Sequence, residues 1–182
     1  GNNSEYDLSI EEDDVKVFNF KKNIGIAAAQ SAGMKWAFEN GSDFVLLLDQ
    51  DSYPDPESIG ILLSSYYRLT LKGYNIGLIA MRDYDDDSGK CSRAIFNKGE
   101  RIDGSNCIIE DCIISSGSLI PKKAYERVGG MDDRLFIDSV DFEYCWRLQA
   151  HGFITVRNND SLLSHRLGVG TKTILGIIHI AV

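Results

Sequence analysis

The sequence predicts an α/β domain in which a mostly parallel sheet is flanked by helices. Two short, continuously apolar runs, at residues 44–48 and 76–81, have the pattern of strands that are covered on both faces. The segments that precede and follow the first run show the apolar spacing of helices. Strands that alternate with helices are typical of α/β folds. With 182 residues, we expect residues 1–182 to form one domain with a sizeable core.

The first half of the chain contains five predicted elements. Apolar and polar residues alternate at first, as in a strand, and an Ala-rich helical segment follows and ends before Gly41. A second helix ends before Gly73, a residue type that commonly follows a helix. In chain order, the predicted elements are a strand at 15–20, a helix at 26–40, a strand at 44–48, a helix at 57–72 and a strand at 76–81.

The second half begins with a polar loop or weak hairpin at 83–98, and residues 107–120 supply one or two further strands. The clearest helix of the chain is predicted at 139–151, where Asp138 or Ser139 can cap the first turn. A strand at 153–156 follows it.

Both ends of the chain depart from what a whole domain of this class requires. Residues 1–4 are turn-like and no apolar strand precedes them, whereas nucleotide-binding α/β folds normally begin with a buried strand and its crossover helix. We therefore expect the first βαβ unit to be missing. The apolar stretch 174–182 is shorter than the roughly 20 residues of a membrane span. It is expected to be a core element or the start of a longer surface-seeking helix.

Composition narrows the possible partners. The chain has 27 acidic and 19 basic residues and a net charge of -8, which argues against binding to a nucleic-acid backbone. An acidic protein that acts on an anionic substrate needs a cation between them. The four cysteines show no metal-type spacing, so we expect reduced thiols and a cytoplasmic location.

Two carboxylates at the end of the first buried run carry the strongest functional signal. Asp49 and Asp51 follow five apolar residues, and alternate side chains of an extended strand point the same way. Ligands of open α/β sheets bind at this end of the strands. A divalent cation with oxygen ligands would relieve the repulsion of the two carboxylates and leave positions for a diphosphate. The alternative is a solvated acidic loop.

A second acidic segment surrounds the start of the helix predicted at 139–151. Asp141 falls in its first turn, where the helix dipole favours the ionised form. A carboxylate held there can accept a proton from an incoming hydroxyl, although a mere capping role is an equal alternative. Glu143 and Arg147 are four residues apart and are expected to form an ion pair on the helix surface. His165, which follows a predicted strand, is a candidate metal ligand or simply a polar residue with a hydrogen-bond partner.

Taken in order, these segments resemble family 2 glycosyltransferases with the GT-A fold, and among them the bacterial rhamnosyltransferase-like group. Residues 23–30 are similar to the donor-side segment of that family, and 47–52 to its DxD motif. Residues 116–120 and then 128–132 resemble the stretch that leads to the acceptor site. Residues 136–147 resemble the acidic catalytic motif, and 164–168 the segment with a late metal-binding histidine.

The resemblance implies a role for particular side chains. Asp51 and His165 would bind the metal, Asp49 would contact the metal or the ribose of the donor, and Asp141 would be the catalytic base. The remaining donor-binding residues implied are Asn23, Gly25 and Gly117.

The predicted activity is the inverting transfer of a sugar to an acceptor hydroxyl, with Mg²⁺ or Mn²⁺ as cofactor. The resemblance suggests rhamnose from dTDP-rhamnose, a saccharide or lipid-linked saccharide as acceptor, and a place in bacterial polysaccharide synthesis. Peripheral contact with the inner face of the membrane stays open. Two alternatives remain at this point: a metal-dependent nucleotidyltransferase or phosphohydrolase, and a non-catalytic module or inactive fragment that binds a nucleotide sugar.

Overall fold

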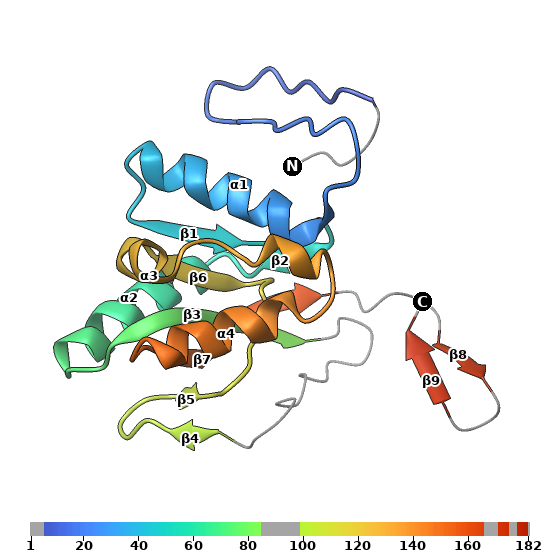
Figure 1. Cartoon of the computed structure of the whole chain (residues 1–182). Coiled ribbons are helices and arrows are strands. Elements are labelled where there is room, and N and C mark those ends of the chain that lie inside the picture. Colours follow the sequence, from blue (N-terminus) through green and yellow to red (C-terminus); the bar gives the residue numbers. More distant parts are fainter. Residues whose placement is uncertain (1–5, 85–98, 166–170, 175–177, 182) are drawn as a thin grey trace.

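The computed structural model describes residues 6–84, 99–165, 171–174 and 178–181, and gives side chains as far as residue 164. The strands of the main sheet are β1 (Phe44–Leu47), β2 (Ser52–Pro54), β3 (Ile76–Tyr84), β4 (Glu100–Arg101), β5 (Cys107–Ile109), β6 (Ser118–Pro121) and β7 (Ile154–His165). They lie in the order β1-β6-β3-β7-β5-β4, and β2 also pairs with β7 (Figure 1). A separate two-stranded sheet joins β8 (Thr171–Ile174) to β9 (Ile178–Ala181).

Strand direction follows the apolar pattern of the sequence. β1 and β3, which contain the two apolar runs, and β7 all point the same way, because β6 is antiparallel to both β1 and β3 and β7 is parallel to β3. The segment 107–120 provides β5 and β6, and both run in the opposite direction. The α/β class is therefore confirmed. The sheet is nevertheless mixed, and β3 and β7 are the parallel neighbours among the described strands.

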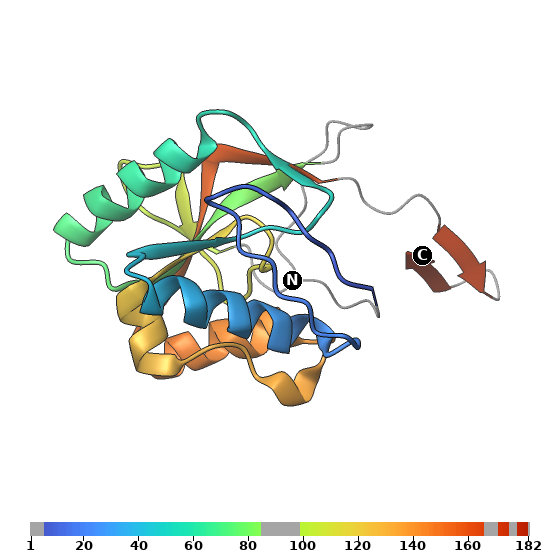
Figure 2. The ribbon, with the colours of Figure 1, turned by 90° about the horizontal axis from the view of Figure 1, so that it is seen from above.

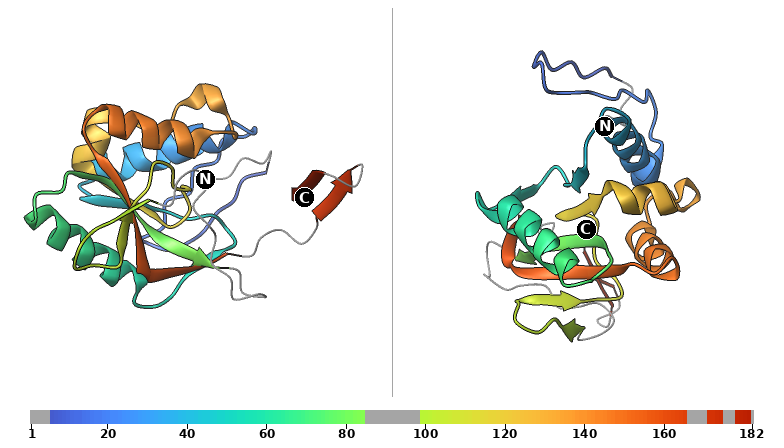
Figure 3. Two further views of the ribbon diagram at one scale, coloured as in Figure 1. Left: turned by 90° about the horizontal axis from the view of Figure 1, so that it is seen from below. Right: turned by 90° about the vertical axis from the view of Figure 1, so that its left-hand side faces the viewer.

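The helices are α1 (Gly25–Glu39), α2 (Ser58–Leu71), α3 (Lys122–Val128) and α4 (Val140–Ala150), with a 3₁₀ turn at Asp133–Leu135. α1, α3 and α4 cover one face of the sheet, and α2 covers the other (Figure 2). Two apolar clusters correspond to these faces. Met34, Phe38 and Leu148 belong to the first cluster, and Leu62 and Leu69 to the second. The sheet is thus the middle of three layers, as both views in Figure 3 also show.

The predicted elements at 26–40, 44–48, 57–72 and 139–151 end within a residue or two of the observed bounds. β1 is less buried than its apolar run predicts, because Leu47 alone of its four residues is buried and Leu48 beyond it is exposed. The last strand is much longer than the predicted 153–156, since β7 continues to His165. α3 has no counterpart in the prediction.

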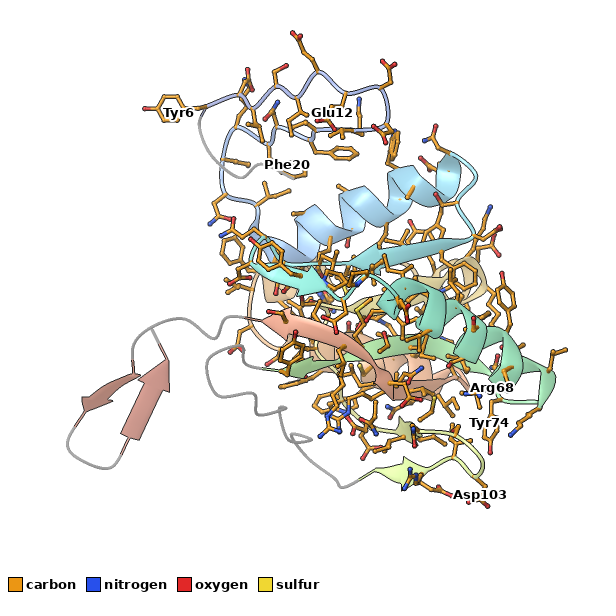
Figure 4. All side chains as sticks on the ribbon, turned by 180° about the vertical axis from the view of Figure 1, so that it is seen from behind. Tyr6, Glu12, Phe20, Arg68, Tyr74 and Asp103 are labelled. Atoms are coloured by element: carbon orange, nitrogen blue, oxygen red, sulfur yellow. The ribbon has the colours of Figure 1, made fainter. Side chains whose placement is uncertain are left out.

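The strand predicted at Val15–Phe20 was wrong. These residues form no strand, only an isolated β-bridge at Asn19, and the segment contacts α1 and a neighbouring loop. Phe18 lies edge-on to Trp36 of α1, with ring centroids 6.3 Å apart. The side-chain amide of Asn19 exchanges two hydrogen bonds with the backbone of Leu8. Figure 4 shows Tyr6, Glu12 and Phe20 together at one end of the molecule and Arg68, Tyr74 and Asp103 at the other.

Two further predictions bear on the fold. Cys107, Cys112 and Cys145 are buried, free thiols, as expected, while Cys91 lies outside the described residues. Within the described parts of the chain, no helix is both long and apolar enough to cross a membrane. Most of the predicted loop 83–98 is also outside the described residues. Its first two positions, Asp83 and Tyr84, extend β3.

Candidate active site

A cavity of about 890 Å³ lies between α1 and β1 and is closed by the loops around residues 50 and 136. Its volume is in the range of cavities that hold a drug-sized ligand. Apolar side chains such as Met34 and Leu47 form part of its wall. The polar residues that line it are Lys16, Asn23, Gln30, Asp49, Gln50 and Asp51.

The two predicted carboxylates both line this cavity, but not in the predicted way. β1 ends at Leu47 and the chain turns at Gln50 and Asp51, so extended geometry does not persist through the motif. The Ser52 N–H instead donates to the Asp49 carbonyl oxygen at 3.2 Å. Asp49 is half-buried and Asp51 is exposed. The turn, rather than strand alternation, brings the two side chains to one cavity.

Asp141 lies in the first turn of α4 and is half-buried. Burial raises the pKa of its carboxyl group and the nearby charge of Asp49 raises it further, while hydrogen bonds from the Ser115 hydroxyl and backbone N–H oppose the rise. No side-chain cap is made by Ser139, which precedes the helix in a left-handed conformation at φ 60°. Asp141 therefore lies near Ser115 and within electrostatic reach of Asp49, although it is not itself among the residues that line the cavity.

A turn at Ser115–Ser118 connects the two acidic sites. Ser115 contacts Asp141, whereas the hydroxyl of the next residue, Ser116, accepts the Asp49 N–H at 3.1 Å and shares a 2.8 Å hydrogen bond with the Ser52 hydroxyl. The turn is closed by the Ser118 N–H, which donates to the Ser115 carbonyl at 2.9 Å. Adjacent serines thus hold the loop after β1 and the start of α4.

Gly117 completes this turn with a φ of +81°, where an added Cβ would lie 2.9 Å from Leu163. Its N–H donates to the Leu47 carbonyl at 2.8 Å, and its carbonyl accepts from Met81 at 3.0 Å. Although Gly117 was predicted to bind the donor, it is buried and is not among the residues that line the cavity. Its observed contacts hold the serine turn against the sheet.

The predicted donor-side residues Asn23 and Gly25 do line the cavity. The Asn23 carboxamide oxygen accepts the Gly25 N–H at 2.9 Å just before α1. Gly25 has a φ of +82°, and a Cβ there would lie 2.5 Å from the Phe136 carbonyl oxygen. That carbonyl accepts the Ala27 N–H at 3.2 Å. The absence of a side chain at Gly25 therefore allows the loop before α4 to close one end of the cavity.

The predicted metal ligands can be followed only in part. The backbone of His165 pairs with Ser52, one residue after Asp51, but the His165 side chain lies outside the described residues. Among the side chains that the structure describes, no three His, Cys, Asp or Glu gather in a way that could hold a metal. In the same part of the chain, neither Asp49 nor Asp51 forms an ion pair. Carboxylates that face a cavity without a basic partner suit a hard divalent cation.

Glu143 and Arg147 form the predicted ion pair, with an Nε–Oε1 distance of 2.7 Å. Arg147 also donates to the carbonyl oxygens of Val128 and Gly130, the latter at 2.8 Å. These bonds attach α4 to the chain that follows α3. Their role is structural, because the guanidinium of Arg147 is fully engaged by Glu143 and by these backbone carbonyls.

Sequence reasoning did not single out Ser52, Ser115, Ser116 or Gln30. The Gln30 amide donates to the Ser115 hydroxyl at 3.1 Å across 85 residues of sequence. The run Ser115-Ser116-Gly117-Ser118 directly before a buried strand was the available signal, since small hydroxyl residues beside a glycine are typical of a tight turn.

The family described as "Glycosyl transferase family 2" matches residues 4–129. The chain belongs to this family. The match covers the cavity-lining start of α1, the loop after β1 and the serine turn. The membership predicted from the motifs is therefore confirmed.

Individual proteins agree with this assignment. The dTDP-rhamnosyl transferase RfbF of Shigella flexneri is 32% identical over 160 residues, which are 86% of this chain and 53% of RfbF. The chain thus spans about half the length of this curated relative. Among solved structures, that of GalNAc-T7 with UDP, GalNAc and Mn²⁺ is similar with a TM-score of 0.62 at 15% identity, over 84% of this chain and 32% of GalNAc-T7. This likeness supports the GT-A-like fold.

Proposed function

We propose that this chain is the catalytic core of an inverting glycosyltransferase, which moves a sugar from a nucleotide diphosphate to an acceptor hydroxyl. The observation that carries the proposal is the placement of Asp141. Asp141 lies in the first turn of α4, near Ser115 and within reach of the charge of Asp49, and Asp49 lines the cavity. A base on one side of a reacting carbon and a leaving-group site on the other are what a single in-line displacement requires.

In this proposal the cavity between α1 and β1 binds the nucleotide diphosphate sugar. Asn23 and Gly25 contribute to its wall, and Asp49 lies where it can contact the ribose or a metal. Asp51, with His165, would hold Mg²⁺ or Mn²⁺, and the ion would neutralise the charge that develops on the departing diphosphate. The match to a structure with UDP and Mn²⁺ supports the choice of ion.

Asp141 acts as the general base. As the acceptor oxygen attacks the anomeric carbon, its proton passes to the Asp141 carboxylate, the bond to the diphosphate breaks, and the configuration is inverted. Burial raises the pKa of Asp141, and a carboxylate with a raised pKa is a stronger proton acceptor.

The substrates follow from the similarity to RfbF. Its name states dTDP-rhamnosyl transfer, and we therefore propose dTDP-rhamnose as donor and a saccharide or lipid-linked saccharide as acceptor. We further propose that the protein works in bacterial polysaccharide synthesis at the cytoplasmic face of the membrane.

The central experiment compares Asp141→Asn with Asp138→Asn. Asp138 is an exposed carboxylate three residues away, whereas Asp141 is half-buried, so Asp138 controls for loss of charge near the start of α4. Asp141→Asn should keep donor affinity, measured by calorimetry with dTDP-rhamnose and Mn²⁺. It should lose about 10²–10⁴-fold in transfer rate, which is the usual contribution of a general base.

Transfer by Asp141→Asn at the parent rate would remove Asp141 from the role of base. The products test the reaction class: a nucleoside diphosphate and a glycoside are expected, whereas pyrophosphate would identify a nucleotidyltransferase. Donor binding by the parent protein without any transfer would favour a non-catalytic module. Undiminished transfer after treatment with a chelator would contradict the metal role of Asp51.

A further inference from the structure

Exposed apolar side chains form part of the wall of the cavity between α1 and β1. Leu48, Phe136 and Ile137 all line this cavity, and all three are exposed, with Ile137 at 69%. Apolar surface that is left uncovered inside a cavity is typical of a ligand-binding site. A ligand that enters the cavity therefore meets apolar groups as well as the carboxylates of the loop after β1.

A strained turn presents Phe136 and Ile137 to the cavity. The Ile137 N–H donates to the Leu135 carbonyl oxygen at 2.7 Å, and Phe136 has a φ of 59° and a ψ of -70°. These values are close to those of the γ-turn with positive φ, which is rare and strained. A strained backbone persists only where the surrounding structure holds it. The position of Ile137 is therefore set by contacts outside the turn.

These contacts come from the start of α1, which lies beside the turn (Figure 2). The Phe136 carbonyl oxygen accepts the Ala27 N–H at 3.2 Å. A Cβ on Gly25 would lie 2.6 Å from the Phe136 ring, so the ring packs directly on the backbone of Gly25. The Phe136 N–H donates to the Asp133 carbonyl oxygen at 3.3 Å. The turn is thus fixed by hydrogen bonds on both sides and by the packing of one ring.

The turn also has a definite place relative to the proposed chemistry. Phe136 and Ile137 belong to the chain segment that runs into α4, which begins at Val140 and carries Asp141 in its first turn. Asp51, at the proposed metal site, lines the same cavity. In an in-line displacement, the sugar lies between the leaving diphosphate and the base. The part of the wall that continues into the base-bearing helix is therefore where a bound sugar is expected to make contact.

We propose that Ile137 is a specificity-determining residue, which contacts the C6 methyl group of a 6-deoxyhexose donor and disfavours the same sugar with a hydroxyl on C6. The proposal rests on the function proposed above. The turn has no N–H to offer such a hydroxyl, because the N–H groups of Phe136 and Ile137 are both bonded to backbone carbonyls. A hydroxyl placed there would give up water without gaining a partner, whereas a methyl group has no hydrogen bond to lose.

The test is calorimetry, with Mn²⁺, of two donors that differ by one oxygen atom. They are dTDP-L-rhamnose and dTDP-L-mannose, which is the same nucleotide sugar with a hydroxyl on C6. The parent protein should bind the deoxy sugar about 10–100-fold more tightly, the discrimination that an apolar pocket gives against an added hydroxyl. Ile137→Asn should bring the two Kd values together, because its carboxamide can bond the hydroxyl. Ile137→Leu keeps the apolar surface and should keep the preference.

Ile59→Asn is the matched control. Ile59 is an exposed isoleucine of α2, on the other face of the sheet, so its replacement should leave the ratio of the two Kd values unchanged. Because Ile137 is exposed, Ile137→Asn should unfold at a temperature close to that of the parent. A loss of preference in Ile137→Asn then reports on the donor rather than on folding.

The same Kd ratio in Ile137→Asn and the parent would overturn the proposal, as would equal binding of the two donors by the parent. These measurements do not depend on turnover. A parent protein that binds the deoxy sugar selectively but transfers no sugar would contradict the proposed function and leave the role of Ile137 in place. A parent that binds neither donor would contradict both.

Discussion

Replacing Gly25 with alanine should destabilise the protein and weaken donor binding together. The backbone at Gly25 has a φ of +82°, and the new Cβ would lie 2.5 Å from the Phe136 carbonyl oxygen and 2.6 Å from its ring. An L-residue in the left-handed region costs about 1–2 kcal/mol, and overpacking costs about 1–3 kcal/mol. The free energy of unfolding should therefore fall by about 2–5 kcal/mol.

Thermal unfolding checks this value, since each kcal/mol shifts the Tm of a chain this long by about 2–4 °C. Displacement of Phe136 should also raise the Kd for the donor, because Phe136 and Ile137 line the cavity. Gly60→Ala is the matched control: it lies in α2 with no atom within 4 Å of the new Cβ, and should stabilise the helix by about 0.5–1 kcal/mol. Equal unfolding temperatures for the two variants would refute the role of close packing at Gly25.

Three other predictions concern charge and burial. In the pH dependence of kcat/KM, activity should be lost as pH falls through the raised pKa of Asp141, which lies above the usual range of an aspartate. Asp49→Asn should move this acidic limb to lower pH, because it removes a charge that raises the pKa of Asp141. Arg157→Met should lower the free energy of unfolding by about 3–5 kcal/mol, since it leaves Glu110 buried without the partner of its ion pair. Chemical denaturation measures this loss. The double variant Glu110→Gln/Arg157→Met should recover much of it. Cys145, whose pKa burial raises to about 12, should resist alkylation at neutral pH in the folded protein, as mass spectrometry of iodoacetamide-treated samples can show.

If Asp141 is the base proposed above, its pKa also links activity to stability. Because the folded protein holds the Asp141 proton more tightly than an unfolded chain does, stability falls as pH rises from the unfolded to the raised folded pKa. The loss then persists at higher pH. Such a loss of folding free energy is typical of a functional group whose role in activity conflicts with stability.

The elements that could be predicted from the sequence are those whose pattern is local. α1, β1, α2 and α4 each carry their own apolar spacing and a glycine or turn residue near the end. The segment 15–20 has an equally clear strand pattern. That prediction failed because strand formation also needs a pairing edge, whereas Phe18 packs on Trp36 and Phe20 stacks on Phe18.

In the candidate site, too, only the features with a local sequence pattern could be predicted. Asp49, Asp51 and Asp141 could be found, since each lies beside a strand end or helix start that the sequence predicts. The interactions that join them could not, because Ser115 meets Gln30 and Ser116 meets Asp49 across 85 and 67 residues of sequence. The turn after β1 was also missed, as strand alternation was assumed to continue past Leu47.

The two adjacent serines have a consequence for how this enzyme family can vary. Ser115 and Ser116 are adjacent in one turn, so a shift of that turn would move the proposed base Asp141 and the loop of Asp49 together. Their separation is thereby kept constant while other parts of the molecule change. New sugar or acceptor preferences would then have to arise in the surrounding loops, where one substrate can be altered without misplacing the other.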